Sequence, residues 1–98
     1  MDSYGRSKEV EKVKPDTLPL DPDVKAALKL IGQEVMAARC THPVFQSAHE
    51  GYAVLLEEIE ELWEEVRKKR GTRTRERMQE ECVQIAAMAI RFLTDVQR

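Results

Sequence analysis

The sequence has few aromatic residues and only two cysteines, and these scarcities narrow the classes of fold. Aromatic residues make up 5% of the 98 residues, whereas 42% are hydrophobic and 35% are charged. This composition suits amphipathic helices better than a β-sandwich. Cys40 and Cys82 lie far apart, and neither belongs to a Cys-x-x-Cys pair. Both fall in stretches typical of apolar helix faces, so we expect buried reduced thiols rather than a disulfide.

Long hydrophobic runs, a signal peptide and a strong net charge are also missing. No apolar run approaches the ~20 residues that a helix needs to span a bilayer, and no segment has the pattern of a secretory signal. A soluble cytoplasmic protein is therefore expected. The formal net charge of −2 provides no global basic field that would favour nucleic acid as a partner.

Residues 1–20 and residues 21–98 differ in character. The first segment contains Pro15 and Pro19 and shows no sustained periodicity, so we expect a flexible N-terminal arm. As an alternative, this arm could strap over a partner subunit through Val10, Val13, Leu18 and Leu20. Residues 21–98 are expected to form one small all-α domain, because helical periodicity recurs and no strand signal is present.

The first helix is expected to begin at Asp21 and Pro22. Asp21 is a favourable N-cap residue, and Pro22 suits the first helical position. The helix should extend to about Cys40, because Thr41-His42-Pro43 then interrupts it. Its core-facing stripe consists of Val24, Ala27, Leu28, Ile31, Val35 and Ala38.

The second and third helices also have clear start signals. Ser47 and Glu50 form a capping box, and the helix that follows should extend to about Arg70, with its basic residues in the last turn. Thr72 or Thr74 caps the third helix, which should extend almost to the C-terminus.

Both of these helices carry broad apolar faces. The face of the second helix consists of Leu55, Leu56, Ile59, Leu62, Trp63 and Val66. The third helix has a stripe of Met78, Cys82, Ile85, Ala86, Ala89, Leu93 and Val96, while Val83, Ala87, Met88 and Ile90 cover most of the remaining circumference. A helix that is apolar nearly all round is buried nearly all round. Three helices can hardly surround it, so we expect oligomerisation to complete the helical bundle.

Two acidic motifs, Glu58-Ile59-Glu60-Glu61 and Glu81-Cys82-Val83-Gln84, lie on successive helices. Each motif places oxygen ligands three residues apart, so that both ligands point from one face of the helix. Two such faces brought together would form an oxygen-lined pocket suited to Mg²⁺, a hard cation that helps to bind phosphates.

Purely structural roles also fit these residues. The glutamates of the second helix could form a solvated face that is balanced by lysines four residues later. Glu81 interrupts an apolar surface and needs a partner if it is buried, which Arg91 or the segment 75–77 could supply. The predicted helical ion pairs are Glu64 with Lys68 and Glu65 with Lys69. The residues alone leave the metal and the structural interpretations equally open.

The segments Glu57–Leu62 and Glu80–Gln84, the latter in a helix rich in Ala and Ile, resemble the MazG-like all-α nucleoside triphosphate pyrophosphohydrolases. The short members from phages and bacteria are the most similar. The signature of this family is Glu-Glu-x-x-Glu on one helix and Glu-x-x-Asp on the next, and the resemblance covers about residues 45–96. It implies hydrolysis of (deoxy)nucleoside triphosphates to the monophosphate and pyrophosphate by a dimer or a dimer of dimers.

By matching position, the resemblance implies that Glu58, Glu61, Glu81 and Gln84 bind Mg²⁺, or Mn²⁺ as an alternative. Glu57 would be an adjoining acid, so that Glu57, Glu58, Glu61 and Glu81 are the predicted catalytic residues. The metal would position the phosphates and neutralise their charge, and a carboxylate would orient or deprotonate the attacking water.

Gln84 departs from the signature, which has aspartate at this position. An amide carbonyl can bind Mg²⁺, but it carries no negative charge and cannot act as a base. Two alternatives therefore stand beside the enzyme. One is a catalytically weakened helical module for interaction or nucleotide sensing, and the other is a structural helical dimer whose glutamates only solubilise it.

Four further residues are candidates for substrate binding. Gln46 and His49 could line a base pocket near the start of the second helix, although a capping or surface histidine is the simpler interpretation. Lys68 belongs to a basic run that could attract a triphosphate, and Arg91 shares a helix face with Glu81. No aromatic residues interleave the basic run, so no nucleic-acid partner is expected.

Overall fold

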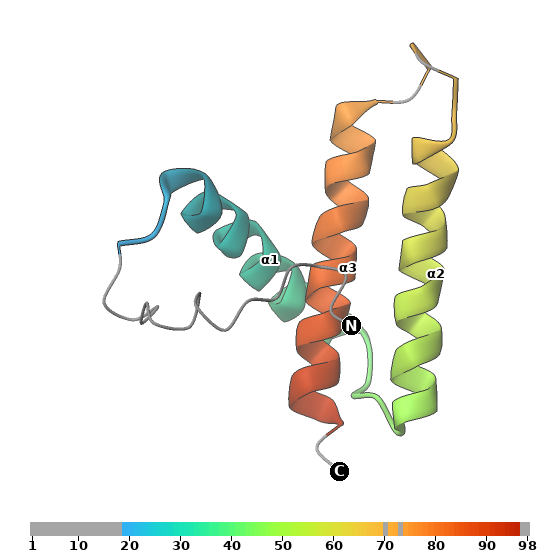
Figure 1. The fold of residues 1–98 in the computed structure, drawn as a ribbon. Coiled ribbons are helices and arrows are strands. Elements are labelled where there is room, and N and C mark those ends of the chain that lie inside the picture. The colour runs from blue at the N-terminus through green and yellow to red at the C-terminus, as the bar shows by residue number, and fades with distance from the viewer. Residues whose placement is uncertain (1–18, 70, 73, 97–98) are drawn as a thin grey trace, which may run out of the picture.

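The computed structural model describes residues 19–69, 71–72 and 74–96, so the predicted arm lies outside the described residues except for Pro19 and Leu20. Across these ranges the chain forms three helices and no strand, which confirms the all-α prediction. The helices are α1 (Pro22–Thr41), α2 (Ala48–Val66) and α3 (Arg75–Asp95). Figure 1 shows α2 and α3 side by side and antiparallel, with α1 against another side of α3. No helix in the described ranges is long and apolar enough to cross a membrane.

Each helix begins at a side-chain cap. Asp21, Ser47 and Thr74 each accept a hydrogen bond from a backbone N–H two or three residues later, at 2.7, 3.1 and 3.1 Å respectively. These bonds satisfy donors that the first turn of a helix leaves without an intrahelical acceptor. The predicted caps Asp21 and Ser47 are thereby confirmed, and Thr74 rather than Thr72 caps α3.

The predicted end of α2 at about Arg70 is wrong, because the helix ends at Val66. Glu65 turns away from solvent and accepts hydrogen bonds from Thr74 N–H at 2.9 Å and from Lys68 Nζ at 2.8 Å. This contact ties the start of α3 to the end of α2. The ion pairs that form are Glu64–Arg67 (3.1 Å) and Glu65–Lys68 (2.8 Å), in place of the predicted Glu64–Lys68 and Glu65–Lys69.

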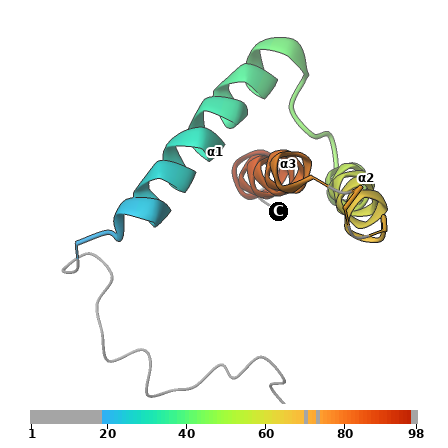
Figure 2. The same cartoon turned by 90° about the horizontal axis from the view of Figure 1, so that it is seen from above.

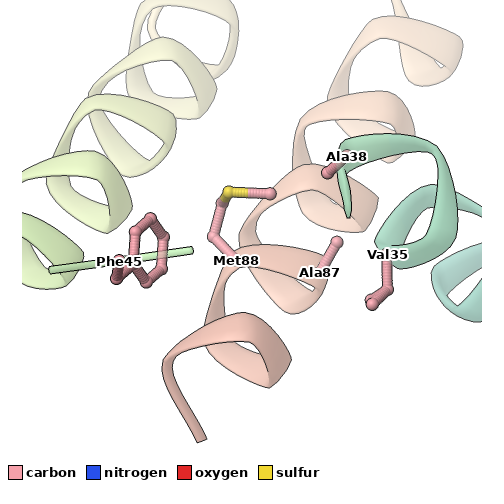
Figure 3. Packing of buried hydrophobic residues seen from close by; sticks show 5 residues of the cluster. All are labelled: Val35, Ala38, Phe45, Ala87 and Met88. Carbon is pink, nitrogen blue, oxygen red and sulfur yellow. The ribbon is translucent and has the colours of Figure 1, made fainter. Parts of the chain in front are cut away.

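A small core joins α3 to α1 and to the loop before α2. Its buried members are Val35, Ala38, Phe45, Ala87 and Met88. Figure 3 shows Met88 extending toward Phe45 on one side of α3, while Ala87 lies near Val35. Ala87 has no exposed surface, and its small side chain lets α1 approach α3 closely.

Gly51 of α2 packs closely against the ring of Phe92 on α3. A Cβ atom at this position would lie only 2.5 Å from Cδ2 of Phe92 and 3.2 Å from Cδ2 of Phe45. Glycine is therefore required here by the packing of the helices, even though its backbone is helical.

In a single chain, the apolar faces of the three helices are only partly covered by other helices. Among the described residues, α1 and α2 contact different sides of α3 and do not pack against one another, as Figure 2 shows from above. The large apolar side chains left exposed are Leu20, Val24, Leu28, Leu30, Met36, Val44, Tyr52, Leu56, Ile59, Trp63 and Leu93. Several of these side chains belong to the apolar faces that were predicted to be buried. For the single chain that prediction is wrong, most clearly for Leu93, which is 74% exposed. Cys40 and Cys82 are also exposed rather than buried, and both are free.

Candidate functional site

Three carboxylates from two helices converge beside the α2–α3 packing surface. Glu58 and Glu61 lie one helical turn apart on α2, and Glu81 faces them from antiparallel α3. One carboxylate oxygen of each residue lies within 4.8 Å of the corresponding oxygens of the other two. The structure therefore brings together three of the four residues that were predicted to bind metal. We call these three residues the carboxylate cluster.

The cluster is electrostatically unfavourable when all three groups are ionised. Burial, together with the charges of Glu61 and Glu81, raises the pKa of Glu58 from 4.5 to about 7. Burial and the charge of Glu61 also raise the pKa of Glu81, although Arg77 acts in the opposite direction. Oε1 of Glu81 is buried and has no hydrogen-bond partner among the described residues. A cation between these oxygens would relieve both the repulsion and the unmet hydrogen-bonding capacity.

A cavity of about 440 Å³ adjoins the cluster, and Glu58 belongs to both. All three helices and the loop at 42–45 contribute to its lining. Glu57 and Gln84 line this cavity, so the predicted adjoining acid and the amide at the signature position lie on its surface. A volume of this size falls within the range of small-molecule sites.

Arg91 also lines the cavity, but its guanidinium is held by other groups of the protein. Nη2 donates a hydrogen bond to the carbonyl oxygen of Pro43 at 2.7 Å, and Nη1 contacts Sδ of Met88 at 3.6 Å. The guanidinium also lies over the ring of Phe45, 4.4 Å from its centroid. Because only 3% of Arg91 is exposed, its main contribution is to fasten the α1–α2 loop to α3. Its predicted role as a partner of Glu81 is not realised.

Asp95 also holds the α1–α2 loop against α3, a role that was not predicted from the sequence. It accepts a hydrogen bond from Phe45 N–H at 3.1 Å and forms ion pairs with Arg39 at 3.1 Å and Arg91 at 3.9 Å. Burial alone would raise the pKa of Asp95, but the Phe45 and Arg39 contacts together hold it below its usual value. The one signal in the sequence was the position of Asp95 four residues after Arg91 on the same helix face.

The other predicted substrate-binding residues lie outside both the cluster and the cavity. Lys68 pairs with Glu65 at the α2–α3 turn, and the same contact lowers the pKa of Glu65. Nε2 of Gln46 donates to the carbonyl of Val44 at 3.1 Å, and the residue lines a separate hollow near Asp95. His49 is exposed at the start of α2.

The geometry thus joins an oxygen-rich cluster to a partly apolar cavity through a single residue, Glu58. Such a pair of sites can hold a divalent cation together with the organic part of a phosphate ester. The resemblance to MazG-like proteins rests on the residues of α2 and α3 alone, since no protein-family model, curated protein or solved structure matches this chain.

Proposed function

We propose that this protein is a Mg²⁺-dependent nucleotide pyrophosphohydrolase, which cleaves (deoxy)nucleoside triphosphates to the monophosphate and pyrophosphate. The observation that carries the proposal is the convergence of Glu58, Glu61 and Glu81 within 4.8 Å beside a cavity of about 440 Å³. Like charges repel, so the approach of these three carboxylates from two helices supports a role that needs their combined charge.

The three carboxylates fit Mg²⁺ or Mn²⁺. Both are cations that oxygen ligands bind well, and the buried Oε1 of Glu81 offers an acceptor without a hydrogen-bond donor in the described part of the chain. When bound, the cation would neutralise and position the phosphates of the substrate. Glu57 is exposed and lines the cavity next to the cluster, which supports a role for its carboxylate in accepting a proton from the attacking water.

The main rival is a nucleotide-sensing module with weakened catalysis. Gln84 favours it, because this half-buried amide lines the cavity where the family signature has a carboxylate. It would leave the site with one negative charge fewer for the metal and for the activation of water. Gln84→Asp separates the two functions. A large gain from a near-zero baseline supports the sensing module, whereas substantial activity of the unmodified protein supports the enzyme.

We further propose that the working form is a homodimer or a dimer of dimers. Tyr52, Leu56, Ile59 and Trp63 recur at intervals of four, three and four residues along α2, and each is exposed, Trp63 by 57%. This spacing produces one continuous apolar stripe, as in helices that pair with another helix. Trp63→Glu should therefore shift the protein toward the monomer in sedimentation equilibrium. An unchanged mass would count against the dimer through α2.

The assay for the proposed function is pyrophosphate release from a panel of NTPs and dNTPs with Mg²⁺ or Mn²⁺. We expect release that depends on the metal and that Glu61→Gln abolishes. Glu60→Gln is the matched control, because Glu60 is an exposed acid of the same helix outside the cluster and the cavity. If no nucleotide is cleaved and none binds in the presence of the metal, the proposed function is wrong. Unchanged metal and nucleotide binding by Glu61→Gln would instead favour the structural helical dimer.

A further inference from the structure

The carboxylate cluster separates two different surroundings along the antiparallel pair of α2 and α3. On one side lies the cavity, whose lining from these two helices comes from residues 50–58 and 84–91. On the other side lie Glu65 of α2 and Arg77 of α3, each four residues beyond the nearest cluster residue of its helix. A nucleotide whose phosphates bind a metal at the cluster therefore has two directions in which its nucleoside can extend.

The cavity suits the nucleoside better than the terminal phosphates. Its apolar lining includes Ala38, Val54 and Met88, whereas four glutamates add negative charge, and no lysine lines it among the described residues. Arg91 also lines the cavity, but it is only 3% exposed, and its Nη2 already donates a hydrogen bond to the carbonyl oxygen of Pro43 at 2.7 Å. Phosphates in the cavity would therefore be repelled by the glutamates without finding an available cation.

Arg77 provides a positive charge on the opposite side of the cluster. It precedes Glu81 by four residues, so that both side chains leave the same face of α3. Arg77 is exposed, and its guanidinium forms no hydrogen bond or ion pair with another described residue, whereas nearby Lys68 is paired with Glu65 at 2.8 Å. Its charge reaches the cluster, because it opposes the rise in the pKa of Glu81 that burial and Glu61 cause. A ligand can therefore bind Arg77 without breaking a contact within the described part of the chain.

We propose that Arg77 binds the β- and γ-phosphates of the nucleotide, so that the nucleoside extends from the cluster in the other direction, into the cavity. This inference rests on the proposed function, which places a metal-bound triphosphate at the carboxylate cluster. A guanidinium binds phosphate oxygens through paired N–H donors. Arg77 also lies in the first turn of α3, where the helix dipole favours anions.

The alternative is a role of Arg77 confined to the protein, in which its charge only offsets that of Glu81. Removing the charge would then change the affinity of the cluster for metal, and the binding of triphosphates and monophosphates would change equally. Binding of Arg77 to the terminal phosphates instead affects the triphosphate alone. The ratio of the two nucleotide affinities therefore distinguishes the two roles.

The test is isothermal titration calorimetry with Mg²⁺, using non-hydrolysable α,β-imido analogues of dATP, dGTP, dCTP and dTTP and the corresponding monophosphates. For the analogues that bind, we expect Arg77→Gln to weaken binding at least about tenfold and to leave monophosphate binding within about twofold. Mg²⁺ alone should bind this variant at least as tightly as the wild type, because a positive charge beside its ligands is lost. Arg77→Lys keeps the charge and should restore part of the lost affinity. Arg75→Gln is the matched control, because Arg75 is an exposed arginine of the same helical turn that lines a separate hollow between α1 and α3.

The outcomes separate this inference from the proposed function. Triphosphate binding that Arg77→Gln leaves unchanged would overturn the role of Arg77 and leave the proposed function standing. An equal loss for triphosphates and monophosphates, or a loss of affinity for Mg²⁺ alone, would show that Arg77 acts through the cluster and would also overturn the inference. If none of the analogues binds the wild type with Mg²⁺, the inference fails together with the proposed function.

Discussion

Replacing Glu81 with glutamine should change the thermal stability of this protein in opposite directions without and with Mg²⁺. The substitution keeps the size of the side chain but removes one of three carboxylates whose oxygens lie within 4.8 Å of one another. Two unit charges at this separation repel by about 1 kcal/mol in water-like surroundings. Because the pairs with Glu58 and Glu61 both disappear, we expect the variant to be more stable by about 1–2 kcal/mol in EDTA. In a domain of this size, each kcal/mol raises Tm by about 4–8 °C.

Mg²⁺ should reverse the order of stability. A ligand present at about 100 times its Kd stabilises the folded protein by about 2.7 kcal/mol, and the variant loses most of this gain with its metal ligand. Thermal unfolding followed by circular dichroism at about pH 8 measures both effects, since Glu58, with a pKa raised to about 7, is then mostly ionised. Glu60→Gln controls for the loss of a surface charge from α2. A variant that is less stable than the wild type in EDTA would show that the three carboxylates do not repel one another. A variant that Mg²⁺ stabilises as much as the wild type would show that Glu81 is not a metal ligand.

The shifted pKa values of Glu58 and Asp95 lead to further predictions. The Mg²⁺ affinity measured by calorimetry should fall about tenfold between about pH 8 and pH 6, because a Glu58 pKa of about 7 lowers its ionised fraction in that ratio; a flat profile would exclude Glu58 as a ligand. Without metal, this raised pKa makes the contribution of Glu58 to folding most favourable below pH 4.5, and the contribution is lost as the pH rises to about 7. The difference in urea stability between wild type and Glu58→Gln should follow that course. Asp95→Asn should lower the free energy of unfolding by about 1.5–3 kcal/mol, since hydrogen bonds to a charged group are lost. Because the pKa of Asp95 is lowered, its stabilising contribution is present above pH 3.8 and disappears only as the pH falls below that value. Urea unfolding near neutral and acidic pH checks both statements about Asp95, and an unchanged midpoint near neutral pH would contradict them.

The helix starts could be predicted because capping is a local interaction. Asp21, Ser47 and Thr74 each bond a backbone N–H within three residues, so the relevant atoms are fixed by the sequence itself. The end of α2 could not be predicted in the same way. Glu65 was predicted to belong to a solvated face, but it accepts a hydrogen bond from Thr74 N–H, nine residues later. The turn between the two residues has a course that helical periodicity does not specify.

The carboxylate cluster shows the same division between local and long-range information. The spacing of Glu58 and Glu61 places them on one face of α2 in any helical model, and the second motif suggested that Glu81 would meet them. By contrast, the Arg39–Asp95 pair joins residues 56 positions apart, and nothing in the sequence selects Arg39 among the basic residues. Helical periodicity indicates an apolar face on each helix, but the sequence of one chain does not show how much of each face a second helix covers.

We propose that Glu58, Glu61 and Glu81 jointly hold a divalent cation, and paramagnetic NMR with Mn²⁺ provides the decisive test. Mn²⁺ broadens the signals of nearby nuclei, so substoichiometric metal should broaden the amide signals around these three residues first, and Glu81→Gln should abolish that pattern while Glu60→Gln preserves it. Broadening that spreads evenly over the glutamates of α2, or that persists in Glu81→Gln, would contradict the claim.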